Sequence, residues 1–138
     1  MAPRGRFSRE QRIQKRADFL EIQASGRRVL TPHFVLLLYA RGRARPGSAR
    51  LGVTVSSRLG KAVFRSRAKR VIREAFRATR ALFPHDFDVV VILRRRPADL
   101  KLGPVVREWQ SAATELERRS RQALEDRKKR ESALAHAG

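Results

Sequence analysis

The sequence predicts one domain in which helices and strands follow in the order αββαβα. The chain has 138 residues, which suits a single domain and is enough to bury about two-thirds of its unfolded surface. Two short apolar runs and one alternating segment have the character of strands, and a strongly amphipathic segment lies between the last two. Strand, helix and strand in succession form a βαβ unit, so we expect these two strands to be parallel if they share a sheet.

The start of the chain indicates a flexible arm followed by a short helix. Residues 1–14 are polar and basic without a hydrophobic period, and we expect them to form a flexible basic arm. Apolar residues then recur at loosely helical spacing over residues 15–25. Gly26 follows, and glycine commonly ends a helix at this position.

Two strands are predicted next, with a loop between them. Residues 34–39, FVLLLY, are too few for an ordinary helix and follow Pro32, which favours a buried strand. Residues 41–48 contain the glycines and proline of an exposed loop. Side chains alternate over residues 50–57, where Leu51, Val53 and Val55 point toward a core and Gly52, Thr54 and Ser56 point away. The second face either admits a ligand or simply meets water.

The second half of the chain predicts a helix, a strand and a last helix. The amphipathic helix over residues 60–82 ends before Pro84, which cannot continue it. Residues 87–93, FDVVVIL, are rich in β-branched side chains and predict a buried strand. A last helix begins near Gly103 and has an apolar stripe of Val105, Trp109, Ala112, Ala113, Leu116 and Ala123. We interpret Trp109 as a core residue, with base stacking as the minority alternative.

The end of the chain differs from the domain in composition. Beyond Arg119 both charges mix and apolar residues become fewer, so we expect the helix to fray into a mobile tail. The predicted organisation is an arm over residues 1–14, one domain over residues 15–118, and a charged helix extension or tail over residues 119–138.

The charge balance indicates a polyanionic partner. Lys and Arg number 33 against 13 Asp and Glu, which gives a formal net charge of +20. Self-repulsion on this scale destabilises a compact fold, and an anionic partner relieves it. By charge alone the partner is a nucleic acid, an anionic membrane surface or an acidic protein.

Composition also excludes several classes of protein. No apolar run approaches the roughly 20 residues that span a bilayer, and no hydrophobic segment follows the basic N-terminus as in a signal peptide. We therefore expect a soluble cytoplasmic protein. Cysteine is absent, which excludes disulfides and thiolate metal sites.

The predicted helix over residues 60–82 carries the strongest functional signal, most of it within residues 60–80. At 100° per residue its apolar face comprises Ala68, Val71, Ile72, Ala75 and Leu82, and its opposite face comprises Arg65, Lys69, Arg73, Arg77 and Arg80, with Arg70 at the margin. Glu74 is the only acid nearby, although ordinary solvated faces mix Glu with Lys. Arginine forks match phosphate oxygens in pairs, so the stripe predicts nucleic-acid contact.

The residues around this helix resemble the protein subunit of bacterial ribonuclease P. That family has a strand ending in Val-Ser, then Gly-Lys/Asn-Ala-Val and Arg-Asn-x-x-Lys-Arg-x-x-Arg. The corresponding residues are Val55-Ser56, Gly60-Lys61-Ala62-Val63 and Arg65-Ser66-x-x-Lys69-Arg70-x-x-Arg73. The flanks agree, with Arg16-Ala17-Asp18-Phe19, Gly26 and FVLLLY before the motif and Asp88-Val89-Val90-Val91 after it. The likeness covers residues 15–116.

The resemblance implies both a fold and a function. The fold is a compact, ribosomal-protein-like α+β domain with a small mixed sheet and a left-handed βαβ crossover, against the usual right-handed rule. The function is to bind the catalytic RNA subunit and the 5′ leader of precursor tRNA during endonucleolytic removal of that leader. The RNA-subunit contacts would be Arg65, Ser66, Arg67, Lys69, Arg70, Arg73 and Arg77. The leader cleft would be lined by Phe19, Phe34, Thr54, Ser56 and Arg58.

Three positions depart from the family pattern. Ser66 replaces the usual Asn, which exchanges an amide that donates and accepts for a shorter hydroxyl. Gln23 and Leu37 stand where related sequences often have aromatic residues in the leader cleft. Because stacking contributes about 1–3 kcal/mol per base, we expect leader binding here to depend more on charge.

The sequence contains no constellation for cutting RNA. His33, His85 and His136 lie in different elements without metal-site spacing, and Glu74 is interpreted first as a salt-bridge partner of its neighbouring arginines. In the resembling family Mg²⁺ bound to the RNA subunit performs the chemistry, so we expect no cofactor on the protein alone, no membrane and no obligate protein partner. The alternatives are a ribosomal or RNA-chaperone protein and, more remotely, a DNA-recognition helix.

Overall fold

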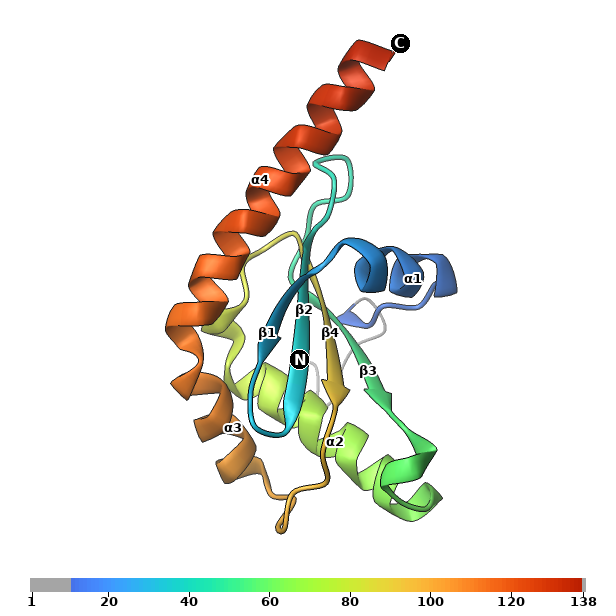
Figure 1. Cartoon of the computed structure of the whole chain (residues 1–138), viewed down its shortest axis with the longest axis vertical. Helices are drawn as coiled ribbons and strands as arrows, with labels where there is room; N and C mark the ends of the chain where they lie inside the picture. Colours follow the sequence, from blue (N-terminus) through green and yellow to red (C-terminus); the bar gives the residue numbers. More distant parts are fainter. Residues whose placement is uncertain (1–10, 138) are drawn as a thin grey trace, which may run out of the picture.

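The structure, a computed structural model, describes residues 11–137 and is built on a four-stranded sheet of order β1-β2-β4-β3. The elements are α1 (Arg16–Ser25), β1 (Arg27–Leu30), β2 (Phe34–Ala40), β3 (Arg50–Val55), α2 (Ala62–Ala78), β4 (Phe87–Leu93), α3 (Leu102–Ser111) and α4 (Ala113–Ala137). In Figure 1, α1 lies apart from the layer formed by α2, α3 and α4, and the two groups pack on opposite faces of the sheet.

The pairing of the strands confirms the predicted βαβ unit. β1 and β4 each pair antiparallel with β2, whereas β3 pairs parallel with β4. α2 therefore connects two adjacent parallel strands. The predicted class, a mixed sheet packed by helices, is confirmed, and β4 has the predicted bounds.

The main core lies between the sheet and the helices α2, α3 and α4. Trp109 is fully buried there, with its ring edge-on to Phe34 at 5.6 Å and to Phe83 at 6.2 Å between ring centres. The interpretation of Trp109 as a core residue is correct. Base stacking by Trp109 is excluded, because none of its side chain reaches solvent.

A smaller core lies under α1 on the other face. Ile22 is 1% exposed and packs with Leu37 and Val90. The segment before α1 is also anchored, since the backbone N–H of Ile13 donates to the Leu51 carbonyl at 2.9 Å. The C-terminal end of the predicted arm is therefore fixed to the sheet, while residues 1–10 lie outside the described residues.

The structure differs from the sequence prediction at β1 and in the last helix. β1 contains two arginines, and Val29 is its only buried side chain, so no apolar pattern marks it as a strand. The predicted single helix is two helices that meet at Ala112. α4 continues to Ala137, so the expected fraying beyond Arg119 is wrong.

Contacts with the sheet explain the continuity of α4. Asp126 accepts two hydrogen bonds of 2.8 Å from Arg27 on β1. Arg130 donates to the Ala40 carbonyl, and its guanidinium lies 4.4 Å from the centre of the Tyr39 ring. Figure 1 shows α4 running past the end of the sheet beside the β2–β3 loop.

Candidate nucleic-acid interface

The apolar face of α2 holds the helix against the sheet. Its buried residues are Ala68, Val71, Ile72, Ala75 and Phe76, of which the first four were predicted. The helix ends at Ala78, short of the predicted residue 82, and Leu82 is half-buried in the 3₁₀ turn that follows. The helix ends where the Thr79 hydroxyl donates to the Ala75 carbonyl at 2.8 Å. The face directed away from this core carries the cations.

The cations of α2 differ in exposure. Arg67 and Arg70 are exposed, as is Ser66 between them and Arg65, whereas the side chains along the flank of the helix are half-buried: Arg65, Lys69, Arg73 and Arg77. Arg80 is exposed in the 3₁₀ turn Arg80–Leu82 that follows the helix. The pKa of Arg73 is below its ordinary value, because burial and the nearby charge of Arg12 both disfavour the protonated guanidinium. The charged form of Arg73 is therefore disfavoured by its surroundings, and a nearby anion would favour it.

No described carboxylate neutralises this stripe. Within residues 11–137, none of the cations from Arg65 to Arg80 forms an ion pair, although ion pairs occur elsewhere, such as Arg50 with Asp88. Glu74 also forms no ion pair within the same residues, so its interpretation as a salt-bridge partner is wrong. The buried Nε atoms of Arg65 and Arg77 have no hydrogen-bond partner in the described part of the chain.

Further cations extend the basic surface beyond α2. Arg58 and Lys61 precede the helix, and Arg94, Arg95 and Arg96 follow β4. Because β3 and β4 are parallel, their carboxyl ends reach the same edge of the sheet, which brings these two segments together. These arginines were not among the predicted site residues, although the predicted parallel pairing of the two strands would place them beside the start of α2.

A second surface lies on the α1 face of the sheet. The Phe19 ring packs so closely on β3 that a Cβ atom at Gly52 would lie 2.6 Å from it, so a larger residue there would displace the ring. Thr54 is half-buried on the same face and is paired with Ile92. The structure therefore places Phe19 and Thr54 on one face, as the sequence predicts.

The carboxyl end of β3 carries the other two predicted leader residues. The Ser56 hydroxyl accepts a hydrogen bond of 3.2 Å from the backbone N–H of Arg58 and so caps the 3₁₀ turn Ser57–Leu59. The Arg58 side chain is exposed. This end of the strand connects the surface of Phe19 and Thr54 with the amino end of α2.

Phe34 does not belong to this surface. Its side chain is 1% exposed and points into the main core against Trp109, on the opposite face of the sheet from α1. The prediction that Phe34 lines the cleft is therefore wrong. At the two positions that depart from the pattern, Leu37 is buried under α1 and Gln23 is exposed beside Phe19.

His33 is held in place by contacts with Glu108. His33 donates its backbone N–H to Glu108 at 2.8 Å, and its ring Nδ1 lies 2.8 Å from the same carboxylate. Burial raises the pKa of Glu108, but hydrogen bonds from Thr31 and His33 outweigh this and lower it. Within residues 11–137 no group of His, Asp and Glu side chains has the arrangement of a metal site.

These features define a small, strongly basic α+β domain of the nucleic-acid-binding class. Its most uniform cationic face lies on one helix of a βαβ unit and has no described carboxylate partner. Among residues 11–137, no helix is long and apolar enough to cross a membrane.

Comparison with known proteins gives the family. The model of the family described as Ribonuclease P matches residues 7–117. The chain is 37% identical over 102 residues to the ribonuclease P protein component of Syntrophus aciditrophicus, covering 74% of this chain and 83% of that protein. The chain belongs to the ribonuclease P protein family.

Solved structures agree with this assignment. The RNase P protein of Staphylococcus aureus superimposes with a TM-score of 0.63 at 32% identity, covering 73% of this chain and 90% of that one. The RNase P protein of Thermotoga maritima gives a TM-score of 0.62 at 31% identity, covering 74% and 94%. The likeness in fold and sequence supports the same family.

Proposed function

We propose that this chain binds the RNA subunit of ribonuclease P through the cationic side of α2. The observation that carries the proposal is an arginine-rich helix, within the residues that the family model matches, whose charges have no described carboxylate partner. The contacting residues are Arg65, Ser66, Arg67, Lys69, Arg70, Arg73 and Arg77. Arginine forks bind phosphate oxygens bidentately, so the RNA backbone would supply the missing anions.

The α1 face would hold the 5′ leader of precursor tRNA. Phe19 and Thr54 lie together on this face, and Ser56 and Arg58 follow at the end of β3. Phe19 would offer the edge or face of its ring to a base, and Arg58 would bind a phosphate. Positions 37 and 23 carry leucine and glutamine, so Phe19 is the aromatic contact that we propose for the leader. Charged contacts would contribute most of the remaining binding free energy.

In this proposal the RNA subunit and its Mg²⁺ cleave the phosphodiester bond. The protein lowers the repulsion between two polyanions and keeps the leader beside the cleavage site. We expect the complex to act in the cytoplasm, where precursor tRNA is processed.

Reconstitution tests this function directly. The purified protein alone should not cleave precursor tRNA, but it should accelerate cleavage by the ribonuclease P RNA at low Mg²⁺, because it replaces part of the cation requirement. Absence of stimulation, with the RNA active at high Mg²⁺, would refute the proposal. Co-purification of ribosomal RNA in place of one stable RNA of ribozyme size would favour the ribosomal or chaperone alternative.

A further inference from the structure

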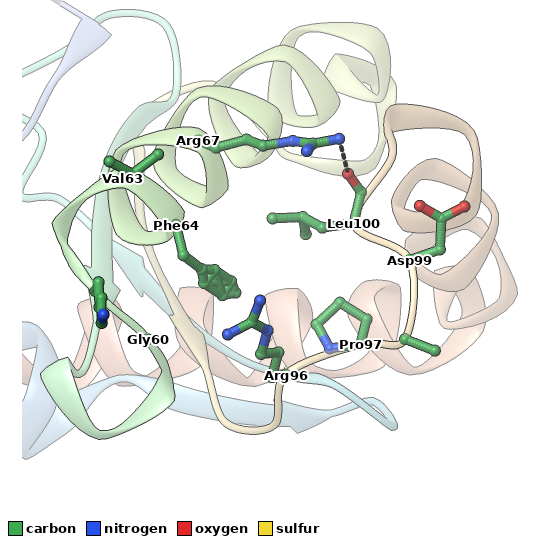
Figure 2. A pocket seen from close by; sticks show the side chains of 10 residues that line it. Gly60, Val63, Phe64, Arg67, Arg96, Pro97, Asp99 and Leu100 are labelled. Atoms are coloured by element: carbon green, nitrogen blue, oxygen red, sulfur yellow. Dashed lines mark hydrogen bonds between the residues drawn. The ribbon is translucent and has the colours of Figure 1, made fainter.

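A hollow of about 580 Å³ lies between the amino end of α2 and the loop that joins β4 to α3. Figure 2 shows Phe64 and Arg67 of α2 on one side of it and Pro97, Asp99 and Leu100 of the loop on the other. Neither its aromatic ring nor its loop belongs to the contacts proposed above. Its location beside the cationic stripe makes it a candidate for a specific RNA contact.

An aromatic ring and a guanidinium are stacked at one side of the hollow. The Arg96 guanidinium carbon lies 4.1 Å from the centre of the Phe64 ring, and Figure 2 shows the two side chains together. Arg96 also donates to the Leu59 carbonyl at 3.4 Å. A Cβ atom at Gly60 would lie 2.7 Å from the Phe64 ring, so the backbone at Gly60 closely limits where that ring can move. The flat pair is thus held in place before any ligand arrives.

The charges around the hollow favour an anion. Lys61, Arg67 and Arg96 line it, and within residues 11–137 none of them forms an ion pair. The one carboxylate in the lining, Asp99, pairs with Lys101 at 3.6 Å. Arg67 donates to the Leu100 carbonyl at 3.3 Å, which leaves other donors of its guanidinium for a phosphate.

We propose that this hollow receives one unstacked base of the ribonuclease P RNA subunit. The base would stack on the Arg96–Phe64 pair with Leu100 opposite, and its flanking phosphates would meet Lys61 and Arg67. A flat cationic plane with an apolar wall matches a nucleobase, whereas a base inside a duplex cannot enter such a site. The inference rests on the proposed function and adds base recognition to backbone contact.

The position of the hollow favours the RNA subunit over the leader as the source of the base. Phe64 packs against the main core on the α2 side of the sheet, and Phe19 lies on the α1 side. Phe64 and Arg67 also belong to the first turns of the helix that carries Arg65 and Lys69. A strand bound along the stripe would therefore pass the mouth of the hollow.

The test measures binding of the full chain to ribonuclease P RNA across salt concentrations. Phe64→Leu keeps an apolar side chain and the net charge but removes the ring, so we expect about tenfold weaker binding with an unchanged salt slope. Arg96→Gln should weaken binding at least as much. Arg118→Gln is the matched control, because Arg118 is an exposed arginine of α4 that pairs with Glu115 and lies outside the hollow, and it should change affinity only about twofold.

A footprint on the RNA separates base stacking from a structural effect. Wild-type protein should protect one unpaired base from a base-modifying reagent, and Phe64→Leu and Arg96→Gln should each lose that protection while melting like folded protein. Binding within twofold of wild type and an unchanged footprint in both variants would overturn the site. The proposal would also be overturned if the variants changed only the Michaelis constant for precursor tRNA, because the hollow would then bind the leader and not the RNA subunit. Failure of the wild type to bind this RNA would refute the proposed function itself.

Discussion

Two regions of this molecule differ in whether their arginines have carboxylate partners. Around the β2–β3 loop, Asp88 is 2% exposed and accepts hydrogen bonds of 2.7–2.8 Å from both Arg41 and Arg50. Along α2, no cation from Arg65 to Arg80 has a carboxylate partner among residues 11–137. The same residue type is therefore paired within the fold in one region and left without a described carboxylate partner in the other.

The difference shows how a chain of such high net charge can fold. Asp and Glu are few, and several are placed where a charge must be buried or a long-range contact held, as at Asp88 and Asp126. A buried charge without a partner costs several kcal/mol, whereas an exposed unpaired arginine is solvated and costs little. The scarce acids thus stabilise the structure, and the unpaired cations concentrate at the surface we assign to RNA.

The largest expected effect comes from reversing charges on α2. Arg65→Glu combined with Arg73→Glu should weaken binding to ribonuclease P RNA by about 100-fold, since phosphate contacts are lost and repulsion is added. The free energy of unfolding should change far less than the binding free energy, because both side chains lie on the flank of α2 and have no described ion pair to lose. Equilibrium binding and thermal melts measure the two quantities.

The control is a pair of reversals in a region where arginines are already paired. Arg118 and Arg121 pair with Glu115 and Glu117 on α4, so Arg118→Glu combined with Arg121→Glu makes the same change in net charge. We expect a much smaller loss of affinity from it. Equal losses of stability and affinity in the α2 variant would mean that its face has been misplaced.

Asp88→Asn should lower stability and leave RNA binding unchanged, which is the opposite of the result expected for the α2 variant. Removing the carboxylate leaves Arg41, which is 4% exposed, without its charge partner, and breaking a buried pair costs about 3–5 kcal/mol. Chemical denaturation should report this loss. The fraction that remains folded should bind RNA as the wild type does, and a comparable defect in that fraction would place Asp88 in the interface.

Phe19→Ala should affect precursor tRNA alone. Loss of one stacking contact predicts a Michaelis constant for precursor tRNA about tenfold higher, with binding of mature tRNA unchanged. Steady-state cleavage with the reconstituted enzyme measures the first quantity and competition by mature tRNA the second. If product binding weakens equally, the leader lies elsewhere.

The lowered pKa of Glu108 predicts that the folded protein loses a small part of its stability in acid. Its pKa is lowered in the folded state, so its contribution is present above the unfolded value near 4.5 and is lost as pH falls through the folded pKa. Glu108→Gln should therefore cost about 1 kcal/mol at neutral pH and flatten the fall in melting temperature below pH 4.5. If the melting temperature of this variant falls below pH 4.5 as steeply as that of the wild type, Glu108 does not cause the loss of stability in acid.

Much of the fold was predictable because its signals are local. The β-branched run of residues 87–93 defines β4, and the helical period of α2 separates its core face from its cations. The alternation in β3 likewise places Thr54 on the α1 face. Each of these patterns depends on neighbouring residues alone.

The missed features depend on distant contacts. Phe34 was assigned to the cleft from the resemblance to the family, and the uniformly apolar run of β2 has no local pattern that could have corrected this assignment. The continuity of α4 depends in part on Arg27 and Asp126, which are 99 residues apart in the chain. The hollow at Phe64 exists only because the loop after β4 folds back onto α2.

The central claim is that the unpaired cations of α2 bind phosphates of the RNA subunit. The most direct measurement is the salt dependence of that binding for the wild type, for Arg65→Gln with Arg73→Gln, and for Arg118→Gln with Arg121→Gln. The α2 variant should lower the slope of log affinity against log salt by about one for each phosphate contact removed, and the α4 variant should leave it unchanged. Equal slopes for both variants would show that binding responds to total charge, which contradicts the account.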